Sequence, residues 1–174
     1  QTATASLKSP AAFAAAKASV SDGTVLTASA RTGAAVGSVT VEVSQLAQAQ
    51  QLTKSGFLSS SAVVGTGTLT LELGSYSGTT FTANPDKSPK SITIDSSNQT
   101  LAGIRDAINN AQAGVTAVIV NGDAGSQLFI SSNESGTKNA VRISQSGGNG
   151  GLSASAFDNG APAGGMSEKA GPLD

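Results

Sequence analysis

The chain has 174 residues and a formal net charge of −1, and hydrophobic residues make up 38%, charged residues 12% and aromatic residues 3% of it. It contains no histidine and no cysteine, which excludes disulfides, cysteine-held zinc and any reaction that needs an imidazole base or a thiolate. Its ten cations are scattered, so the charge pattern indicates neither a nucleic-acid surface nor an anionic membrane as a partner, and no apolar run approaches the ~20 residues that span a bilayer.

The first part of the chain, residues 1–35, is rich in small residues and predicts little packing. Residues 10–17 favour a short helix with a proline in its first turn, and residues 19–31 favour extended chain. The chain begins with Gln1 rather than methionine, which favours a processed protein or an excised fragment.

The first strong strand pattern lies at residues 39–43. Val39, Val41 and Val43 alternate with polar residues, which is the period of a half-buried strand. The nearby sequence supplies no partner for this strand, so we expect the segment that completes its sheet to lie elsewhere. Serines and a glycine at residues 55–61 then predict a loop.

Further strands are predicted by alternation and by short apolar runs between turn residues, at 66–73, 76–82, 92–94, 115–120, 127–131 and 140–144. Residues 115–120 are apolar on both faces, which predicts an inner strand covered on both sides. The segment Asn121–Gly125 predicts a turn, with Asn-Gly as its strongest element.

One amphipathic helix is predicted at residues 101–113. Thr100 or Asn98 can cap its N-terminus, because each offers a side-chain oxygen to the free N–H groups of the first turn, and Gly114 suits a left-handed C-terminal cap. Spacings of three and four define an apolar stripe, formed by Leu101, Ile104, Ile108 and Ala111. The side expected to face water carries Arg105, Asn109 and Asn110.

The tail, from residue 147 to 174, is dense in glycine and predicts a loop or linker with little packing. Together these elements predict an α+β fold, in which antiparallel, β-rich domains carry one main helix at about 101–113.

Catalytic and metal sites find little support in the residue inventory. A Ser–Lys nucleophile would have to draw on lysines in small or polar surroundings, namely Lys17, Lys54, Lys138 and Lys169. A paired-carboxylate site would draw on Asp95, Asp106, Asp123 and Glu134, whose positions in turns and on a helix surface are explained equally well by solvation. No loop has the dense oxygen ligands of a calcium site. We therefore predict no catalytic, cofactor-binding or metal-binding residues and no enzymatic activity.

Three short motifs have structural explanations. Gly65-Thr66-Gly67 precedes a strand rather than a helix, so we interpret it as a hairpin turn and not as a phosphate loop. Asn98–Thr100 and Asn133–Ser135 match the N-glycosylation pattern, and helix capping and turn formation account for both. The predicted strand faces are full of Thr, Ser and Gln with few charges, which suits contacts with other subunits and simple solubility equally.

Five segments carry a recognisable pattern. They are GSVTVEVSQLAQAQQL (Gly37–Leu52), GTGTLTLELG (Gly65–Gly74), ITID (Ile92–Asp95), TLAGIRDAINNAQAGVTAVIV (Thr100–Val120) and LFISSNESGTKNAVRIS (Leu128–Ser144). The last four resemble the insertion motif shared by flagellins, hook-associated proteins and the filament cap. With the LAQAQ element in the first, the set resembles the flagellar filament cap family, also called hook-associated protein 2 or FliD.

The resemblance implies an extracellular structural protein at the flagellum tip. Members of that family are homo-oligomeric rings that help flagellin to fold and insert, with coiled-coil legs in the full-length protein. It implies a leg-proximal segment at residues 1–35, an inner head segment at 36–53, an outer head domain at 54–150 with the insertion motif at 65–144, and a return segment at 151–174. The alternatives are an adhesin-like module that binds host glycans or mucin, and a domain of flagellin or of a hook–filament junction protein.

Overall fold

The computed structural model describes residues 16–24, 26–43, 46–159 and 165–172. It divides the chain into two compact units, Gln1–Val43 and Ser44–Asp174. We call the second of these the head unit. The division expected after residue 53 falls inside strand β1, which spans Gln51–Phe57. No helix of the described residues is long and apolar enough to cross a membrane.

The first unit has no helix or strand among its described residues. The half-buried strand predicted at Val39–Val43 is therefore wrong for this chain: Val39 is 88% exposed and Val43 49% exposed. The physical reason is that no described segment pairs with it, so its alternating valines have no layer to pack on. Of the helix predicted at residues 10–17, residues 10–15 lie outside the described part, and Ala16 and Lys17 are not helical.

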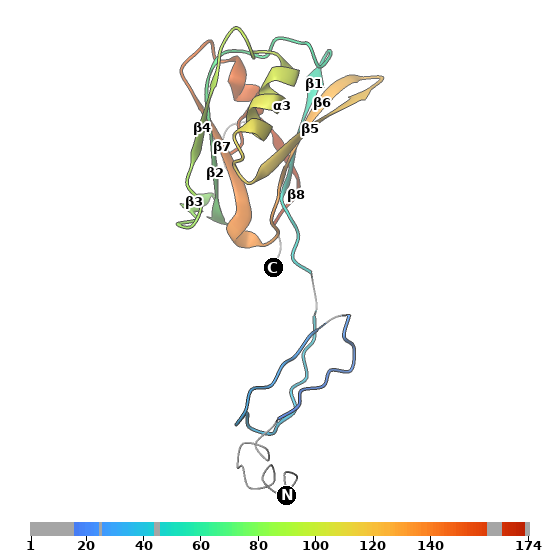
Figure 1. Ribbon diagram of the computed structural model, residues 1–174. Coiled ribbons are helices and arrows are strands. Elements are labelled where there is room, and N and C mark those ends of the chain that lie inside the picture. Colours follow the sequence, from blue (N-terminus) through green and yellow to red (C-terminus); the bar gives the residue numbers. More distant parts are fainter. Residues whose placement is uncertain (1–15, 25, 44–45, 160–164, 173–174) are drawn as a thin grey trace, which may run out of the picture. The chain divides into compact units, whose positions relative to one another are not determined.

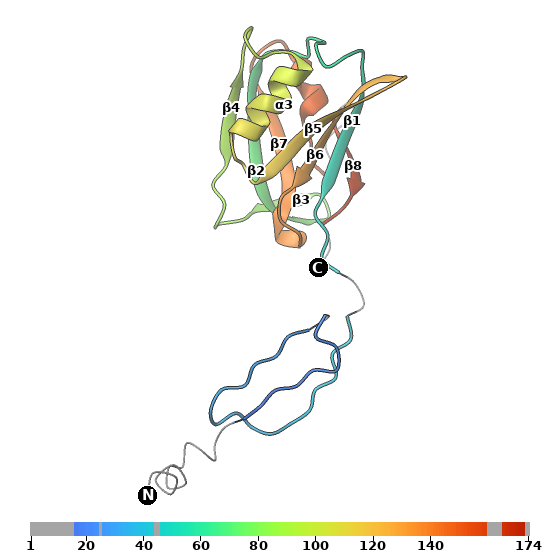
Figure 2. The same cartoon turned by 45° about the vertical axis from the view of Figure 1, so that its right-hand side comes forward.

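The head unit is built from two antiparallel sheets that face each other (Figures 1 and 2). The first sheet has the order β5-β6-β1-β8. Its strands are β1, β5 (Val115–Gly122), β6 (Gly125–Ser132) and β8 (Ser167–Ala170). β1 lies between β6 and β8, although both of these strands come much later in the chain. The loop predicted at residues 55–61 therefore begins too early, because the strand continues to Phe57 through a bulge at Gly56.

The second sheet is arranged around β2, which spans Gly67–Ser77. One edge of β2 pairs with β4 (Lys90–Ile94) and β3 (Thr80–Ala83), and the other pairs with β7 (Ala140–Ser146). The strand predicted at residues 76–82 is instead two strands, because β2 runs on to Ser77 and turns into β3 at Gly78, where φ is +60°.

Helix α3 (Leu101–Asn110) packs against β5 and β4 and covers the core on one side of the two sheets (Figure 1). The Thr100 hydroxyl accepts a hydrogen bond from the Gly103 N–H at 3.1 Å, which selects Thr100 over Asn98 as the cap. The helix ends three residues before the predicted position, and Gly114 takes a positive φ of 77° in the loop that follows. The predicted stripe is confirmed: its three large members are fully buried, and Ala111 packs against the core at its edge.

The core between the sheets consists mainly of Leu, Ile and Val. In the second sheet, the alternation of β2 supplies three buried leucines and β7 adds Val141 and Ile143; β6 of the first sheet supplies the facing Leu128 and Ile130. The fully buried large side chains of the core include Leu52, Leu69, Leu71, Ile94, Leu101, Ile104, Ile108, Leu128, Ile130, Ile143 and Leu152. An α+β fold with antiparallel sheets and one main helix is thus confirmed for the described part of the head unit.

Three other expectations are corrected by the structure. β5 is an edge strand, with one face exposed at Val118 and Val120, and not an inner strand. The turn after it consists of Asp123 and Ala124, because Asn121 and Gly122 still pair with β6. The tail is packed rather than loose: a 3-10 turn at Gly151–Ser155 buries Leu152, and Phe157 and Met166 beyond it are buried in the same core.

Candidate interaction surfaces

The four lysines considered as partners of a serine nucleophile lie on the surface or on strand β1. A lysine that activates a hydroxyl has to be desolvated, and Lys17 and Lys138 are exposed. Lys169 places its Nζ 5.2 Å from the ring centroid of Phe129, a cation–π contact that keeps the ammonium at the protein surface. Lys54 lies in β1. Lys17, Lys138 and Lys169 are therefore surface residues, and Lys54 is half-buried.

The four carboxylates considered as a pair are dispersed over the head unit. Asp95 follows β4, Asp106 lies in α3, Asp123 lies at the β5–β6 turn and Glu134 follows β6. The hydroxyl and N–H of Ser97 donate to Asp95 at 2.6 and 2.8 Å, and these bonds hold the pKa of that carboxyl below its usual value. Asp106 pairs with the neighbouring Arg105, and Glu134 pairs with Lys87. These partners indicate turn and surface roles.

The short motifs also have local structural roles. Gly65 and Thr66 lead into β2 and do not form the predicted hairpin turn; the Thr66 N–H donates to Asn149 Oδ1 at 3.1 Å. The chain is too close there for side chains, since a Cβ on Gly67 would lie 2.8 Å from the Ser146 carbonyl. Asn98 folds back onto the end of β4, accepting from the Asp95 N–H and donating to the Thr93 carbonyl, and Asn133 accepts from the hydroxyl of Thr116.

The residue that sequence reasoning missed is Gln50, which immediately precedes β1 and is only 1% exposed. Its Oε1 accepts from the Val141 N–H at 2.6 Å, and its Nε2 donates to Glu168 Oε1 at 2.6 Å. One amide thus joins the start of β1 to β7 in the opposite sheet and to β8 beside it. The sequence holds no signal for this, because Gln48 and Gln50 are both neutral residues in a run of Ala and Gln.

One outward surface lies on the first sheet, and we call it the Phe129 face. Strand register places Val118, Phe129, Thr53 and Ser167 in one row across β5, β6, β1 and β8. Directly opposed residues of antiparallel strands share a face. Phe129 and half-exposed Val118 therefore form the apolar part of this row, and half-exposed Val120 lies next to it on β5. Lys169 covers the Phe129 ring from the β8 side.

The other outward surface lies on the second sheet, and we call it the Phe81 face. Its rows are rich in Thr and Ser, and its one ion pair joins Arg142 to Glu72 at 2.6 Å across β7 and β2. The Phe81 ring lies across Gly74, where a Cβ would be 2.7 Å from its Cζ, and Arg142 stacks on that ring with 4.2 Å from guanidinium carbon to centroid.

Tyr76 pairs with Phe81 across β2 and β3 and extends the Phe81 face. Its ring meets that of Phe81 edge-on at 5.0 Å between centroids, and its hydroxyl donates to Asp158 Oδ1 at 3.1 Å. Burial, with the nearby Asp158 carboxylate as a smaller cause, raises the pKa of the Tyr76 phenol well above its ordinary value. The phenol therefore stays neutral and a hydrogen-bond donor at physiological pH.

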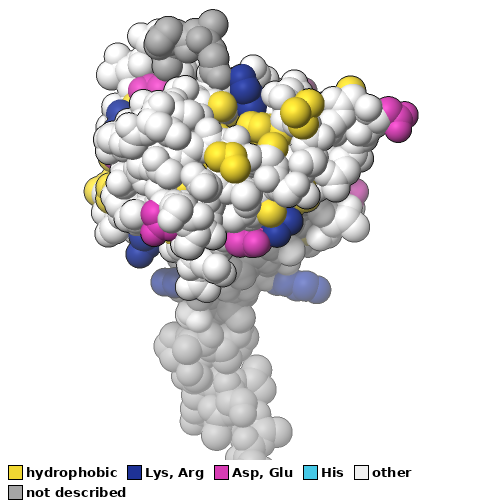
Figure 3. Space-filling model, turned by 90° about the horizontal axis from the view of Figure 1, so that it is seen from above, with side chains coloured by type: hydrophobic (Ala, Val, Ile, Leu, Met, Phe, Trp, Pro, Cys, Tyr) yellow, Lys and Arg dark blue, Asp and Glu magenta, His cyan; other side chains and the backbone are white. Residues whose placement is uncertain are grey.

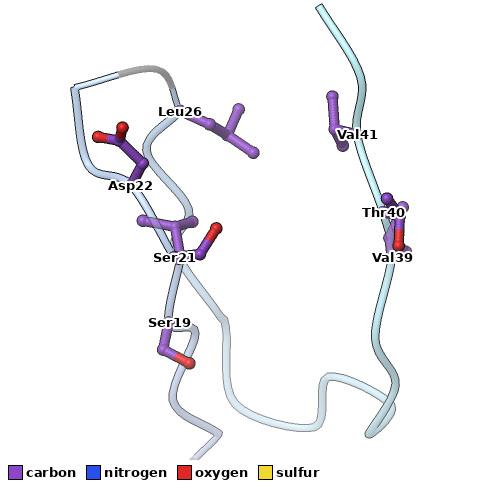
Figure 4. A pocket seen from close by; sticks show the side chains of 8 residues that line it. Ser19, Ser21, Asp22, Leu26, Val39, Thr40 and Val41 are labelled. Carbon is purple, nitrogen blue, oxygen red and sulfur yellow. The ribbon is translucent and has the colours of Figure 1, made fainter.

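Exposed apolar side chains occur at two further places. In the first unit, a hollow of about 340 Å³ lies between the segment at Ser19–Leu26 and the segment at Val39–Val41, and Figure 4 shows Leu26 reaching toward the latter. In the head unit, the β1–β2 loop exposes Leu58 and Val63 at 92% and 64%. Figure 3 shows hydrophobic side chains gathered near the middle of the face seen from above.

Comparison with known proteins gives two family matches in sequence order. Residues 1–50 match the flagellar hook-associated protein 2 N-terminus, and residues 68–134 match the flagellin hook IN motif. The B-type flagellar hook-associated protein 2 of Pseudomonas aeruginosa is 36% identical over 109 residues, which cover 62% of this chain and 21% of that protein. The chain therefore spans about a fifth of this curated relative.

Solved structures of flagellar cap proteins share the fold. The D1-D2-D3 domains of FliD from Escherichia coli match with a TM-score of 0.64 and 35% identity, over 74% of this chain and 35% of that chain. FliD (HAP2) from Pseudomonas aeruginosa PAO1 matches with a TM-score of 0.57 and 30% identity, over 80% of this chain and 63% of that chain.

Proposed function

Because the chain belongs to the flagellar hook-associated protein 2 (FliD) family, we propose that it forms the head of a structural subunit of the bacterial filament cap. The observation that carries this proposal is the order of the two family matches, an N-terminal hook-associated protein 2 segment followed by the insertion motif, on a fold shared with cap proteins. The insertion motif alone would fit flagellin or a junction protein equally; the N-terminal match favours the cap.

The proposed role is mechanical and not catalytic. The head presents two sheet faces that are low in charge: the Phe129 face with one stacked lysine, and the Phe81 face with one internal ion pair. Surfaces of this kind suit protein–protein contacts, which are depleted of charge at their centres and enriched in aromatic residues and arginine. We propose copies of the same protein in a ring, and flagellin, as the partners, at the tip of the flagellum outside the cell.

The domain roles follow from the same proposal. Residues up to Val43 would belong to the part of the protein nearer the legs, and the head unit would be the part that projects outward. The adhesin alternative, binding of host glycans or mucin, gains no support from the relatives, which are hook-associated and cap proteins. No observation favours it over the cap.

Complementation tests the proposal. The full-length protein that contains this chain is expressed in a strain that lacks its own cap protein, and filament length and secreted flagellin monomer are measured. We expect long filaments and little free flagellin, and a variant that lacks residues 51–172 should leave filaments short. Sedimentation of the full-length protein should give a closed oligomer. A monomer that binds a glycan array and leaves filament growth unchanged would overturn the cap assignment.

A further inference from the structure

Strand β5 has an open edge. It pairs with β6 on one side, and it is the terminal strand of its sheet. In an antiparallel pair, the N–H and C=O of alternate residues point away from the partner strand. The Ser132 N–H donates to the Gln50 carbonyl and therefore points away from β5. Val115 lies opposite Ser132, so its own N–H and C=O point away from β6. The same holds for every second residue along β5, namely Ala117, Ile119 and Asn121.

At one of these residues, Ala117, both outward backbone groups already have hydrogen-bond partners. The Ala117 N–H donates to Asn109 Oδ1 at 2.8 Å, and Asn109 Nδ2 donates to the Ala117 carbonyl at 2.9 Å. A carboxamide carries the same donor and acceptor as a peptide group. Asn109 thus makes with Ala117 the pair of bonds that a residue of a neighbouring strand would make.

The fold places Asn109 there by a short connection. Asn109 is in the last turn of α3, and the chain reverses into β5 through Gln112 and Gly114, with φ of 48° and 77°. A side chain at Gly114 would meet Leu73 Cδ1 at 2.7 Å, so the reversal is held tight against β2. The helix side predicted to face only water therefore contacts a strand edge at Asn109.

We infer that Asn109 closes the edge of β5 at Ala117 and so prevents this strand from pairing with β5 of a second copy. An open edge needs such a device here, because residues 115–122 carry no charge and expose Val118 and Val120. Uncharged edges with apolar side chains are templates for strand addition, and proteins protect them with charges, bulges or covering elements. The inference does not rest on the cap assignment.

The closure is partial, which makes it measurable in the unaltered chain. Ile119 lies two residues on with the same outward direction, beyond the reach of the Asn109 amide. In the full 174-residue chain, we expect the protection factor of the Ala117 amide against hydrogen exchange to exceed that of Ile119 by about tenfold. Equal protection would overturn the inference, and this comparison needs no substitution.

Two variants test the consequence for association. Asn109→Leu removes both bonds, and Asn110→Leu makes the same change at an exposed neighbour as the matched control. We expect Asn109→Leu to lose the Ala117 protection and to form dimers or larger species in sedimentation at concentrations where Asn110→Leu stays like the parent. Adding Val120→Lys to Asn109→Leu should restore the parent's behaviour, because a charge on the edge opposes pairing. Association that survives Val120→Lys, or that Asn110→Leu shares, would overturn the inference.

Discussion

Replacing Gln50 with leucine tests the clamp between the two sheets. The leucine is close in size, so the cavity left is small, but the Val141 N–H loses its acceptor in a buried setting and Glu168 loses its donor. A buried donor without a partner costs about 1–3 kcal/mol, and a hydrogen bond to a charged group contributes about 1.5–3 kcal/mol. Burial of the leucine side chain returns about 1 kcal/mol of this.

The expected net loss is therefore about 1.5–5 kcal/mol in the free energy of unfolding of the head unit. For a unit of this size that lowers Tm by roughly 10 °C. Urea unfolding followed by circular dichroism measures it, and hydrogen exchange should show the loss concentrated in β8 and at the Val141 amide.

Gln48→Leu supplies the control, because Gln48 is exposed two residues earlier in the same Ala-Gln run. Its stability should change by less than about 0.5 kcal/mol. If the two leucine variants unfold at the same urea concentration, the clamp contributes nothing and the reasoning fails.

Three further outcomes are expected. Ile104→Asp should destabilise the head unit by more than about 4 kcal/mol, since it buries an unpaired charge, whereas Arg105→Ala should cost about 0.5 kcal/mol or less; equal thermal shifts would mean that the buried helix face is misassigned. Gly74→Ala should cost about 1–3 kcal/mol or more, because a Cβ there would overlap the Thr82 carbonyl of β3 and lie 2.7 Å from Phe81 Cζ; β3 amide and Phe81 ring resonances that stay unmoved in NMR spectra would contradict this. Tyr76 is the single tyrosine and the chain has no tryptophan, so tyrosinate absorbance reports on Tyr76 alone. Because the pKa of Tyr76 is raised in the folded chain, tyrosinate should appear only above the ordinary value of about 10. The stability that this group contributes should be full below that pH and fall as the pH rises past it. Tyrosinate formation in the folded chain at or below pH 10 would refute the burial argument.

The helix could be predicted closely from the sequence, and its strand partners less so. Spacings of three and four at Leu101, Ile104 and Ile108 indicate one apolar face. A surface helix packs on the core through one such face, so the local pattern is enough to predict it. β5 shows the limit of such patterns: Val118 and Val120 are as apolar as Val115, and sequence spacing does not reveal whether a second layer covers them. Among the described residues, Val118 is 49% and Val120 50% exposed, so no second layer buries them.

The long-range contacts could not be predicted for a different reason. Leu152, Phe157 and Met166 stand among glycines and small residues, where local composition indicates a loop. The segment that holds them lies along β7, where Phe157 bridges to Ile143, and Met166 leads into β8, which returns to β1; neither pairing has a local signature. Gln50 is hidden for the same reason, since its two partners lie 91 and 118 residues further on.

The position of β1 between β6 and β8 has a consequence for the order of folding. Leu52 opposes Ile130 on one side and Glu168 on the other, so the first strand of the head unit is also among the last to be completed. Closing the long loops between β1 and its two partner strands is slow compared with forming the β2–β3 hairpin or α3. In a chain that emerges from its N-terminus, β2 to β7 would therefore pair first while one edge of β1 stays unpaired. The head unit would be completely folded only when the residues around Met166 have emerged and β8 has paired with β1.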